Sequence, residues 1–354
     1  MNQTKKVVHV NLAKSFRGGE IQTFELIKAL HACGLQQEAV CRKNSPLAER
    51  LMALSYVQVT QVSGPLSGHL SGRDARFHAI VHAHEARAVY WAWIENLLRH
   101  TPYVITRRVI NSLGQSWATK KAYQGATALA AVSSYAASVL AQSVQRNVHV
   151  VMDACRQFPV GNASQPISDR WPGSPRIGHV GEIDDAVKGQ GLLIKAFLRV
   201  LRFYPEARLF LIGEGKDRTI LMDQCKDQDR IVFVGAVNNV NEWLRQLDVF
   251  CFPSHIEALG SSVLEAMDAG VPVVVSNTGG LPELVGNQER GLLVSEKTVE
   301  AWSKAIIEVL EKPEETKVRA EFAKAFVLQN NATSMAQKYL EIYRTLWSQR
   351  LELS

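Results

Sequence analysis

The stretch Phe252-Pro-Ser-His-Ile-Glu-Ala-Leu-Gly-Ser-Ser-Val-Leu-Glu-Ala-Met-Asp-Ala-Gly-Val-Pro-Val-Val-Val-Ser276 decides the fold of this chain of 354 residues. Its pattern predicts a strand that ends at Pro253, a loop that carries Glu257, and a helix that Gly260 opens. A second apolar run then begins at Val271. A strand, a loop, a helix and another strand in this order form the repeating unit of a parallel α/β sheet.

The same alternation of apolar runs and amphipathic segments continues on both sides of this stretch. We expect strands at residues 6–12, 37–41, 56–60, 79–84, 103–107, 127–133, 148–152, 176–180, 207–212, 230–234, 249–253 and 271–276. We expect helices at residues 20–33, 85–98, 192–203, 240–247, 261–269, 299–310 and 333–350. In the first of these helices Leu26, Ile27 and Leu30 share one face, as an amphipathic crossover helix requires. The pattern therefore predicts an α/β fold with doubly wound parallel sheets.

A linker interrupts this alternation near the middle of the chain. Residues 158–175 contain four prolines and two glycines without periodicity. The length also exceeds one ordinary domain of roughly 150 residues. We predict a Rossmann-like domain over 1–160, a linker over 161–174, a second Rossmann-like domain over 175–332, and a helix over 333–354 that packs back toward the first domain. Ligands are expected in a cleft between the carboxyl edges of the two sheets.

The basic charge is concentrated in the first half of the chain. The net charge is +6, with 19 Lys and Arg against 9 Asp and Glu in residues 1–175, and 21 against 25 in residues 176–354. A basic half can attract nucleic acid, anionic lipid or a phosphorylated substrate. No nucleic-acid-binding module is recognisable, so we do not expect nucleic acid as a partner. A basic surface that is merely solvated is an equal alternative.

Composition also excludes several classes of protein. The five cysteines form no CxxC pair, so neither a disulfide framework nor a zinc site is indicated. No stretch of about 20 predominantly apolar residues is present, as a membrane-spanning helix would need. The polar start leads directly into a short apolar strand and lacks the apolar core of a signal peptide. We therefore expect a cytoplasmic protein.

The loop and helix that follow the strand ending at Pro253 predict an anion site. Gly260 allows the backbone to approach a ligand closely, and the first three amide groups of the helix favour a negative charge. These amides belong to Ser261, Ser262 and Val263. Glu257 in the loop and Glu265 in the helix could accept hydrogen bonds from sugar and ribose hydroxyls. The alternative is a solvated loop glutamate and an exposed helix glutamate.

This stretch resembles the E-x7-E signature of family 4 retaining glycosyltransferases, which have the GT-B fold of two facing Rossmann-like domains. Seven residues separate Glu257 from Glu265, and the match continues through Ala266-Met-Asp-Ala-Gly-Val-Pro-Val-Val274 and Thr278-Gly-Gly-Leu-Pro-Glu283. The resemblance implies that Glu257 contacts the transferred sugar, that Glu265 holds the nucleotide ribose, and that the helix start binds the diphosphate. It is firm over residues 176–295 and the last helix, and looser in the first half.

A second element is Ile177-Gly-His-Val-Gly-Glu-Ile-Asp-Asp-Ala-Val-Lys-Gly-Gln-Gly-Leu-Leu193, in which Lys188 lies just before a helix. A lysine in this position can neutralise the diphosphate, whose departure is the difficult step. The element resembles the family's G-R-x5-K-G pattern, whose basic residues hold the donor phosphates. Gly181 and Lys188 match it, but Glu182 stands where the family usually has Arg. This departure removes one expected contact with the donor, and a turn residue that faces solvent is the alternative interpretation of Glu182.

A third element is Phe16-Arg-Gly-Gly-Glu20, which follows the first strand. Gly18 and Gly19 resemble the family's glycine-rich turn, which approaches the donor phosphate and sugar. An ordinary tight turn between strand and helix is the alternative. In the second half, Leu211-Ile-Gly-Glu-Gly215 and Val232-Phe-Val-Gly-Ala236 resemble two further family strands with their turns. The second of these turns usually lies near the nucleotide base, which implicates Val237.

Two short motifs end strands of the first half. His82-Ala-His84-Glu85 resembles the family's H-x-H element, and we place His84 at the site, with a satisfied core histidine as the alternative. Thr106-Arg-Arg108 falls where relatives often have Thr-x-His beside the transferring sugar. Arg108 in that place resembles some members of the lipopolysaccharide type. An arginine stays protonated and cannot act as a general base, but it can bind a phosphate of donor or acceptor.

The resemblance implies a glycosyltransferase that retains the configuration of the sugar and needs no metal or other cofactor. The implied catalytic residues are Glu257, Lys188, Arg108 and His84. The basic first half favours an acidic or lipid-linked glycan acceptor, such as a lipopolysaccharide core, with peripheral contact to the anionic inner membrane face. A cytosolic acceptor of the sucrose or glycogen type is an alternative. A nucleotide-sugar 2-epimerase and a catalytically weak subunit that supports a partner transferase are two further alternatives.

Overall fold

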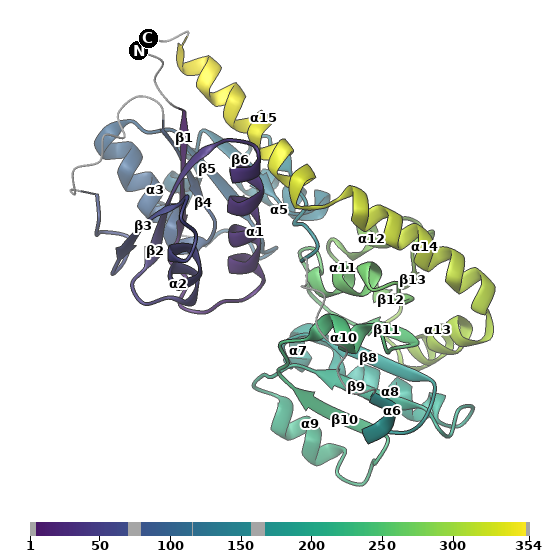
Figure 1. Ribbon diagram of the computed structural model, residues 1–354. Coiled ribbons are helices and arrows are strands. Elements are labelled where there is room, and N and C mark those ends of the chain that lie inside the picture. The colour runs from purple at the N-terminus through teal and green to yellow at the C-terminus, as the bar shows by residue number, and fades with distance from the viewer. Residues whose placement is uncertain (1–4, 70–78, 115, 157–166, 352–354) are drawn as a thin grey trace. The chain divides into compact units, whose positions relative to one another are not determined.

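The computed structural model describes residues 5–69, 79–114, 116–156 and 167–351. The described residues form two compact units, each built on one parallel sheet (Figure 1). The first unit contains the described residues of Met1–Arg156 and Asn330–Ser354, and the second unit contains those of Gln157–Gln329. The last helix, which the sequence analysis expects to return to the first domain, thus belongs to the first unit.

The first unit contains a sheet of seven strands in the order β3-β2-β1-β4-β5-β6-β7. Its elements are β1 (Lys6–Asn11), α1 (Gly18–Ala32), β2 (Gln36–Arg42), α2 (Pro46–Met52), β3 (Gln58–Val62), β4 (Ala79–Ala83), α3 (Ala86–Arg99), β5 (Tyr103–Arg107), α4 (Trp117–Gln124), β6 (Ala128–Ala131), α5 (Ser134–Val144), β7 (His149–Val150) and α15 (Ala332–Leu351). Adjacent strands pair in parallel throughout, as their crossover helices require.

Helices cover both faces of this sheet because successive strand residues point to opposite sides. In β1, Val7 packs in the core that α1 and α15 cover, whereas Val8 packs in the core that α3 and α5 cover. Both valines are buried. Helix α15 contributes Tyr339, Tyr343 and Trp347 to the first of these cores, and it packs beside α1. The C-terminal helix is therefore a structural part of the first unit.

The second unit contains a sheet of six strands in the order β10-β9-β8-β11-β12-β13. Its elements are α6 (Ile167–Arg170), β8 (Arg176–Val180), α7 (Asp185–Lys188), α8 (Gln190–Val200), β9 (Arg208–Ile212), α9 (Arg218–Gln224), β10 (Ile231–Gly235), α10 (Val240–Leu244), β11 (Val249–Phe252), α11 (Ser261–Asp268), β12 (Val273–Ser276), α12 (Leu281–Val285), β13 (Leu292–Val294), α13 (Val299–Glu311) and α14 (Pro313–Gln329). Helices α8 and α13 bury their apolar faces against β8, β9 and β11, where Phe197 and Trp302 fill the core.

The strand order creates one switch point in each sheet. In the first unit the chain leaves β1 toward β2 on one side, and β4 lies on the other side. In the second unit the same reversal occurs between β8 and β11. Loops at the carboxyl ends of the strands that flank a switch point diverge, and ligands of such sheets bind between them. The relevant loops follow β1 and β4 in the first unit, and β8 and β11 in the second.

The observed sheets confirm the predicted α/β fold with two Rossmann-like parallel sheets. Strand β13 and helices α2, α4, α5, α6, α7, α9, α12 and α14 were not expected from the sequence. Most of these elements are short, and α14 mixes charged and apolar residues without a clear apolar face. Helix α1 also begins two residues earlier than expected, so Gly18 and Gly19 form its first turn. Within the described part of the chain, no helix is both long enough and apolar enough to cross a membrane.

Candidate functional site

The second unit brings Lys188 and Glu257 together at its switch point. Lys188 ends α7, in the loop after β8, and Glu257 lies in the loop after β11. The Nζ of Lys188 lies 2.5 Å from Oε2 of Glu257, and 5.0 Å from the ring centre of Phe252. Both charged side chains are largely but not fully buried, at 20% and 14% exposure. Sixty-nine residues apart in sequence, these groups form one ion pair at the carboxyl edge of the sheet.

Backbone contacts fix the two loops to each other. The carbonyl of Val187 accepts hydrogen bonds from the His255 amide at 2.7 Å and from the Ser254 hydroxyl at 3.0 Å. Gly189 follows with φ of +70°, and a Cβ there would overlap the carbonyl of Pro253. Only glycine permits this approach without strain. The position of Lys188 is therefore set by the loop that carries Glu257.

The start of α11 is the place at which the sequence predicts an anion site. Gly260 precedes the helix with φ of +104°, a conformation that glycine adopts readily. The Val263 amide, expected to be free, donates instead to the Gly260 carbonyl at 3.0 Å, because the first turn closes tightly. Ser261 and Ser262, both half-buried, supply the other two amides.

The remaining donor-site candidates occupy the same edge of the second sheet. Glu265 is half-buried in the second turn of α11, and Val237 is half-buried after β10. Gly181 follows β8, and its amide donates to the Ile212 carbonyl at 3.0 Å. Glu182 is exposed, and its carbonyl accepts a hydrogen bond from Gln190 Nε2 at 2.8 Å. The only basic side chain that the loop of residues 181–188 provides is Lys188.

A buried histidine that the sequence analysis did not single out supports the Lys188 loop. His179 in β8 donates from Nδ1 to the Cys251 carbonyl at 3.0 Å, and its Nε2 lies 3.2 Å from Gln190 Nε2. Burial lowers the pKa of His179 to about 4, although the hydrogen bond to Cys251 opposes this shift. The ring is therefore neutral at pH 7, and Nε2 accepts from Gln190. The sequence signal that could have identified His179 is a histidine inside an otherwise apolar strand.

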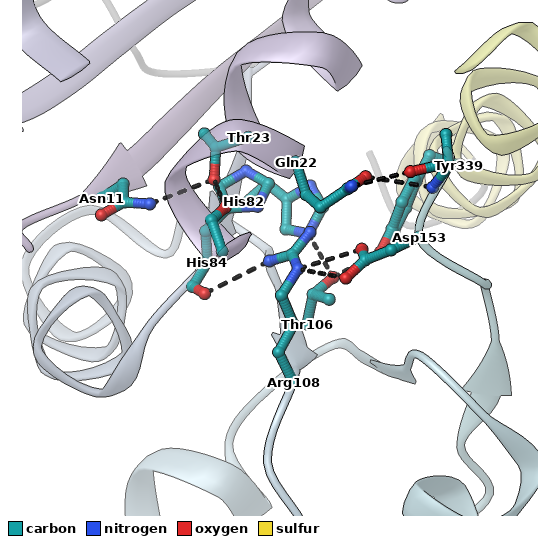
Figure 2. A network of polar contacts seen from close by, with 11 residues as sticks. Asn11, Gln22, Thr23, His82, His84, Thr106, Arg108, Asp153 and Tyr339 are labelled. Carbon is teal, nitrogen blue, oxygen red and sulfur yellow. Dashed lines mark hydrogen bonds and ion pairs between the residues drawn. The ribbon is translucent and has the colours of Figure 1, made fainter. Parts of the chain in front are cut away.

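In the first unit, a buried polar network occupies the carboxyl ends of β1, β4 and β5 (Figure 2). Arg108 donates from Nε to both carboxylate oxygens of Asp153, at 3.0 and 3.1 Å, and from Nη1 to the His84 carbonyl at 3.4 Å. Burial raises the pKa of Asp153, and the Arg108 guanidinium opposes that shift. Asp153 was not expected from the sequence. It follows β7, far from Arg108 along the chain.

His82 and His84, two residues apart on β4 and the loop after it, have different surroundings. The Nδ1 of His82 lies 2.6 Å from the Tyr343 hydroxyl, and its Nε2 lies 2.7 Å from the Thr106 hydroxyl. His82 is therefore a satisfied core histidine that connects β4 and β5 with α15. Among the residues that the structure describes, His84 has a hydrogen-bond partner at only one ring nitrogen, since its Nε2 lies 3.0 Å from Nδ1 of His9. Glu85 caps α3 and also accepts a hydrogen bond from the Leu12 amide at 3.1 Å.

The imidazoles of His9, His82 and His84 lie close enough together to be considered as ligands of a metal ion. Five of their six ring nitrogens already have hydrogen-bond partners, so a metal would have to displace contacts with other side chains. Burial lowers the pKa of His9 to about 4 and keeps the pKa values of His82 and His84 well below the ordinary value, with their charged neighbours adding to the effect. The cluster is therefore a neutral hydrogen-bond network at pH 7.

Gly18 and Gly19 lie beside this network, in the first turn of α1. The Arg17 amide donates to the Glu20 side chain at 2.9 Å and closes the start of the helix. A Cβ on Gly19 would lie 3.7 Å from Cδ of Arg108, which is ordinary contact distance. Gly18, Gly19, His84 and Arg108 therefore share one edge of the first sheet. The sequence motifs of this unit converge in space as their positions after strands predict.

Comparison with known proteins connects this geometry with a family. Residues 174–312 match the family described as Glycosyl transferases group 1. A glycogen synthase of Mycobacterium tuberculosis is 34% identical over 194 residues, which cover 49% of this chain and 46% of the relative. The lipopolysaccharide core biosynthesis mannosyltransferase LpsB of Rhizobium meliloti is 28% identical over 188 residues, which cover 49% of this chain and 53% of LpsB. The chain thus spans about half the length of these curated relatives.

Solved structures resemble the chain over nearly its whole length. The Anabaena protein HepE, solved in complex with UDP, has a TM-score of 0.80 at 17% identity, covering 96% of this chain and 100% of HepE. WaaG, a glycosyltransferase involved in lipopolysaccharide biosynthesis, has a TM-score of 0.63 at 18% identity, covering 95% of this chain and 99% of WaaG. The chain therefore has the GT-B fold of these structures, and its residues 174–312 match the family model described as Glycosyl transferases group 1.

Proposed function

We propose that the chain is a retaining glycosyltransferase that moves a sugar from a nucleotide-sugar donor to an acceptor hydroxyl without a metal. The observation that carries this proposal is the Lys188–Glu257 pair beside the start of α11, at the switch point of the second sheet. A cation and helix amides suit the donor diphosphate, whereas a carboxylate suits sugar hydroxyls. HepE, of the same fold, has been solved with UDP and with UDP-glucose, which supports a nucleotide-sugar donor.

In this proposal each candidate site residue of the second unit has one role. Glu265 accepts hydrogen bonds from the ribose, Val237 lies near the base, and the amides of Ser261 and Ser262 bind the diphosphate. The donor diphosphate replaces Glu257 as the partner of Lys188, so Glu257 becomes free to contact the sugar. Lys188 then neutralises the charge that develops on the leaving group.

The proposed reaction breaks the bond between the anomeric carbon and the diphosphate oxygen. The acceptor oxygen forms its bond to the same carbon from the face that the diphosphate leaves, which retains the configuration. The acceptor proton passes to the departing phosphate oxygen. No side chain needs to act as the base, which is consistent with the permanent charge of Arg108.

Turnover of nucleotide sugars tests the proposed function. We expect the chain to release a nucleoside diphosphate from one of the UDP, GDP or ADP sugars. Release should be slow when water is the acceptor and faster when a sugar acceptor is added. It should also continue in the presence of EDTA. Nuclear magnetic resonance of the product should show the retained configuration. An epimerised nucleotide sugar in the absence of acceptor would show a 2-epimerase instead. Binding of a donor without turnover under any condition would favour the weakly active supporting subunit, for which Glu182 in place of Arg is the motivation.

The acceptor that we propose is an acidic or lipid-linked glycan at an anionic membrane surface, as in lipopolysaccharide core synthesis. The first unit supports this with the exposed side chains of Trp117, Lys120 and Lys121 on α4. LpsB and WaaG, by their names, act in lipopolysaccharide biosynthesis. An indole beside lysines suits an anionic membrane surface. Each basic residue near such a surface contributes about 1 kcal/mol to the free energy of binding.

We expect binding to vesicles that contain anionic phospholipid, and we expect added salt to weaken it. Replacement of Lys120 and Lys121 together by Gln should weaken binding by roughly tenfold or more, at about 1 kcal/mol per lysine. The exposed Lys226, in the second unit, gives a control substitution to Gln that should change little. Absence of binding, or binding that salt leaves unchanged, would exclude this acceptor class in favour of a free cytosolic acceptor.

A further inference from the structure

The loop of residues 63–69, which follows β3, is joined to α3 through a buried histidine. Nδ1 of His69 lies 2.9 Å from Oε2 of Glu95, and Nε2 of His69 lies 2.7 Å from the Pro65 carbonyl oxygen. The exposed fractions of the His69 and Glu95 side chains are 4% and 2%. Because water has so little access, both ring nitrogens depend on these partners within the protein.

The two hydrogen bonds of His69 require two protons, because both of its partners are acceptors. A carbonyl oxygen can only accept, so Nε2 of His69 donates to Pro65. An ionised carboxylate can also only accept, so Nδ1 donates to Glu95. A histidine that donates from both nitrogens is the charged imidazolium, whereas a neutral ring would leave one of the two acceptors unmet.

Arg99, one turn further along α3, favours the carboxylate form of Glu95. Its Nε lies 3.5 Å from Oε1 of Glu95, and its Nη2 donates to the His69 carbonyl. A cation at this distance stabilises the negative charge, most of all where water is excluded. The contact between the loop and α3 is therefore an imidazolium beside a carboxylate.

The remaining titratable residues of the neighbouring elements have partners elsewhere or face solvent. Apart from His69, the loop of residues 63–69 and β3 contain no titratable side chain. On α3, the Tyr90 hydroxyl lies 2.7 Å from the Thr119 hydroxyl, and Arg87 is exposed. The proton balance of the docked loop therefore depends on the pair that His69 forms.

An indole completes the contact and also reports on it. The ring centres of Trp91 and His69 are 4.5 Å apart, and Nε1 of Trp91 donates to the Ser67 carbonyl at 3.0 Å. The face of an indole attracts a cation, so this stacking suits the charged form of His69. Departure of the loop would expose the indole N–H of Trp91 to water, and exchange of that proton therefore measures docking.

We propose that His69 and Glu95 form a pH-sensitive latch that holds the loop of residues 63–69 on α3. Loss of the proton on Nδ1 leaves a lone pair that faces a buried carboxylate, and this repulsion releases the loop. Above about pH 6.5, where a free histidine is neutral, the docked loop holds one proton more than the released loop. Docking is therefore stable at low pH and is lost as the pH rises. Since the loop follows β3, its release changes the surface at the carboxyl edge of the first sheet.

The full chain, labelled with ¹⁵N at histidine and tryptophan, provides two readouts of the latch by nuclear magnetic resonance. At about pH 6, both ring nitrogens of His69 should carry protons. Between about pH 6 and pH 9, the protection of the Trp91 indole proton, corrected for the intrinsic exchange rate, should fall by up to about tenfold per pH unit, the slope for one proton. A bare Nδ1 at the lower pH, or protection that does not change with pH, would overturn the proposal.

Glu95→Gln separates the latch from its pH dependence, because an amide can donate where a carboxylate can only accept. The amide nitrogen donates to Nδ1 of a neutral His69, while the amide oxygen still accepts from Arg99. We expect Glu95→Gln to keep the loop docked, with His69 protonated at Nε2 alone, and to make the protection of the Trp91 indole proton independent of pH. A pH dependence equal to that of the parent chain would contradict the role given to Glu95.

Two substitutions of histidine complete the test. A glutamine side chain cannot donate to both partners from two positions, so His69→Gln should reduce the protection of the Trp91 indole proton about tenfold or more at low pH. His149→Gln, at an exposed histidine of the same unit, should behave as the parent chain does. If Glu95→Gln does not fold, the parent chain and His69→Gln decide the question. Loss of the pH dependence in His69→Gln supports the latch, and its persistence there overturns it.

Discussion

Replacement of Lys188 by Ala is expected to lower kcat/KM for donor turnover by about 10²–10³-fold. This is the typical loss when one group that stabilises developing charge is removed from an enclosed site. Lys188 is the only basic residue in the loop of residues 181–188, because Glu182 stands where the G-R-x5-K-G pattern that this loop resembles has a second one. The measurement is the rate of nucleoside diphosphate release from the donor at saturating acceptor.

The loss of the Lys188–Glu257 pair could also destabilise the second unit, so the unfolding temperature must be recorded for each variant. Lys216→Ala is a matched control, because Lys216 lies in the neighbouring loop and pairs with Asp184 at 3.0 Å, with 65% of its side chain exposed. We expect Lys216→Ala to retain activity within about threefold, as exposed ion pairs contribute little. Turnover by Lys188→Ala close to that of the parent chain, or an equal loss in Lys216→Ala, would contradict the role given to Lys188.

Replacement of Gly279 by Ala is expected to destabilise the second unit by about 3 kcal/mol or more and to reduce donor turnover with it. Gly279 has φ of +55°, which costs an L-residue about 1–2 kcal/mol. A Cβ there would also overlap the carbonyl oxygen of Glu257, which adds roughly 1–3 kcal/mol of strain. Relief of the overlap must move the backbone of Glu257 away from Lys188.

The control for this substitution is Gly270→Ala. Gly270 has φ of +77°, but no atom lies within 4 Å of the position that its Cβ would take. It should therefore show the conformational cost alone, about 1–2 kcal/mol, with turnover unchanged. Denaturant unfolding measures the first quantity and diphosphate release the second. Equal destabilisation by the two substitutions would show that the contact with Glu257 carries no energy.

The sequence predicts the second unit better than the first because its functional residues lie within short, continuous motifs. The segment from Phe252 to Ser276 carries the strand, the loop glutamate and the helix start together, so local pattern alone positions them. Lys188 likewise follows β8 within one loop. Lys188 and Glu257 follow β8 and β11, the two strands that flank the switch point, where ligands of a parallel sheet are expected to bind.

The network of the first unit could be predicted only in part, because its members come from distant segments. His84 and Arg108 were expected from motifs. Asp153 follows β7, whereas His9 and Tyr339 lie in β1 and α15, and none of the three carries a local signal. Their contacts depend on strand order and on the docking of the last helix. The pairing of Arg108 with Asp153, which offsets the charge of the guanidinium, could therefore not be predicted.

The most direct test of a metal-free nucleotide-sugar site in the second unit is thermal unfolding with a panel of nucleoside diphosphates and nucleotide sugars. Each ligand is measured with and without EDTA, on the parent chain, Glu265→Ala and the exposed control Glu289→Ala. One nucleotide at about 100 times its Kd should stabilise the parent chain by about 2.7 kcal/mol. That stabilisation should survive EDTA, persist in Glu289→Ala and disappear in Glu265→Ala. No shift with any nucleotide, a shift that EDTA abolishes, or a shift that Glu265→Ala retains would contradict the proposed site.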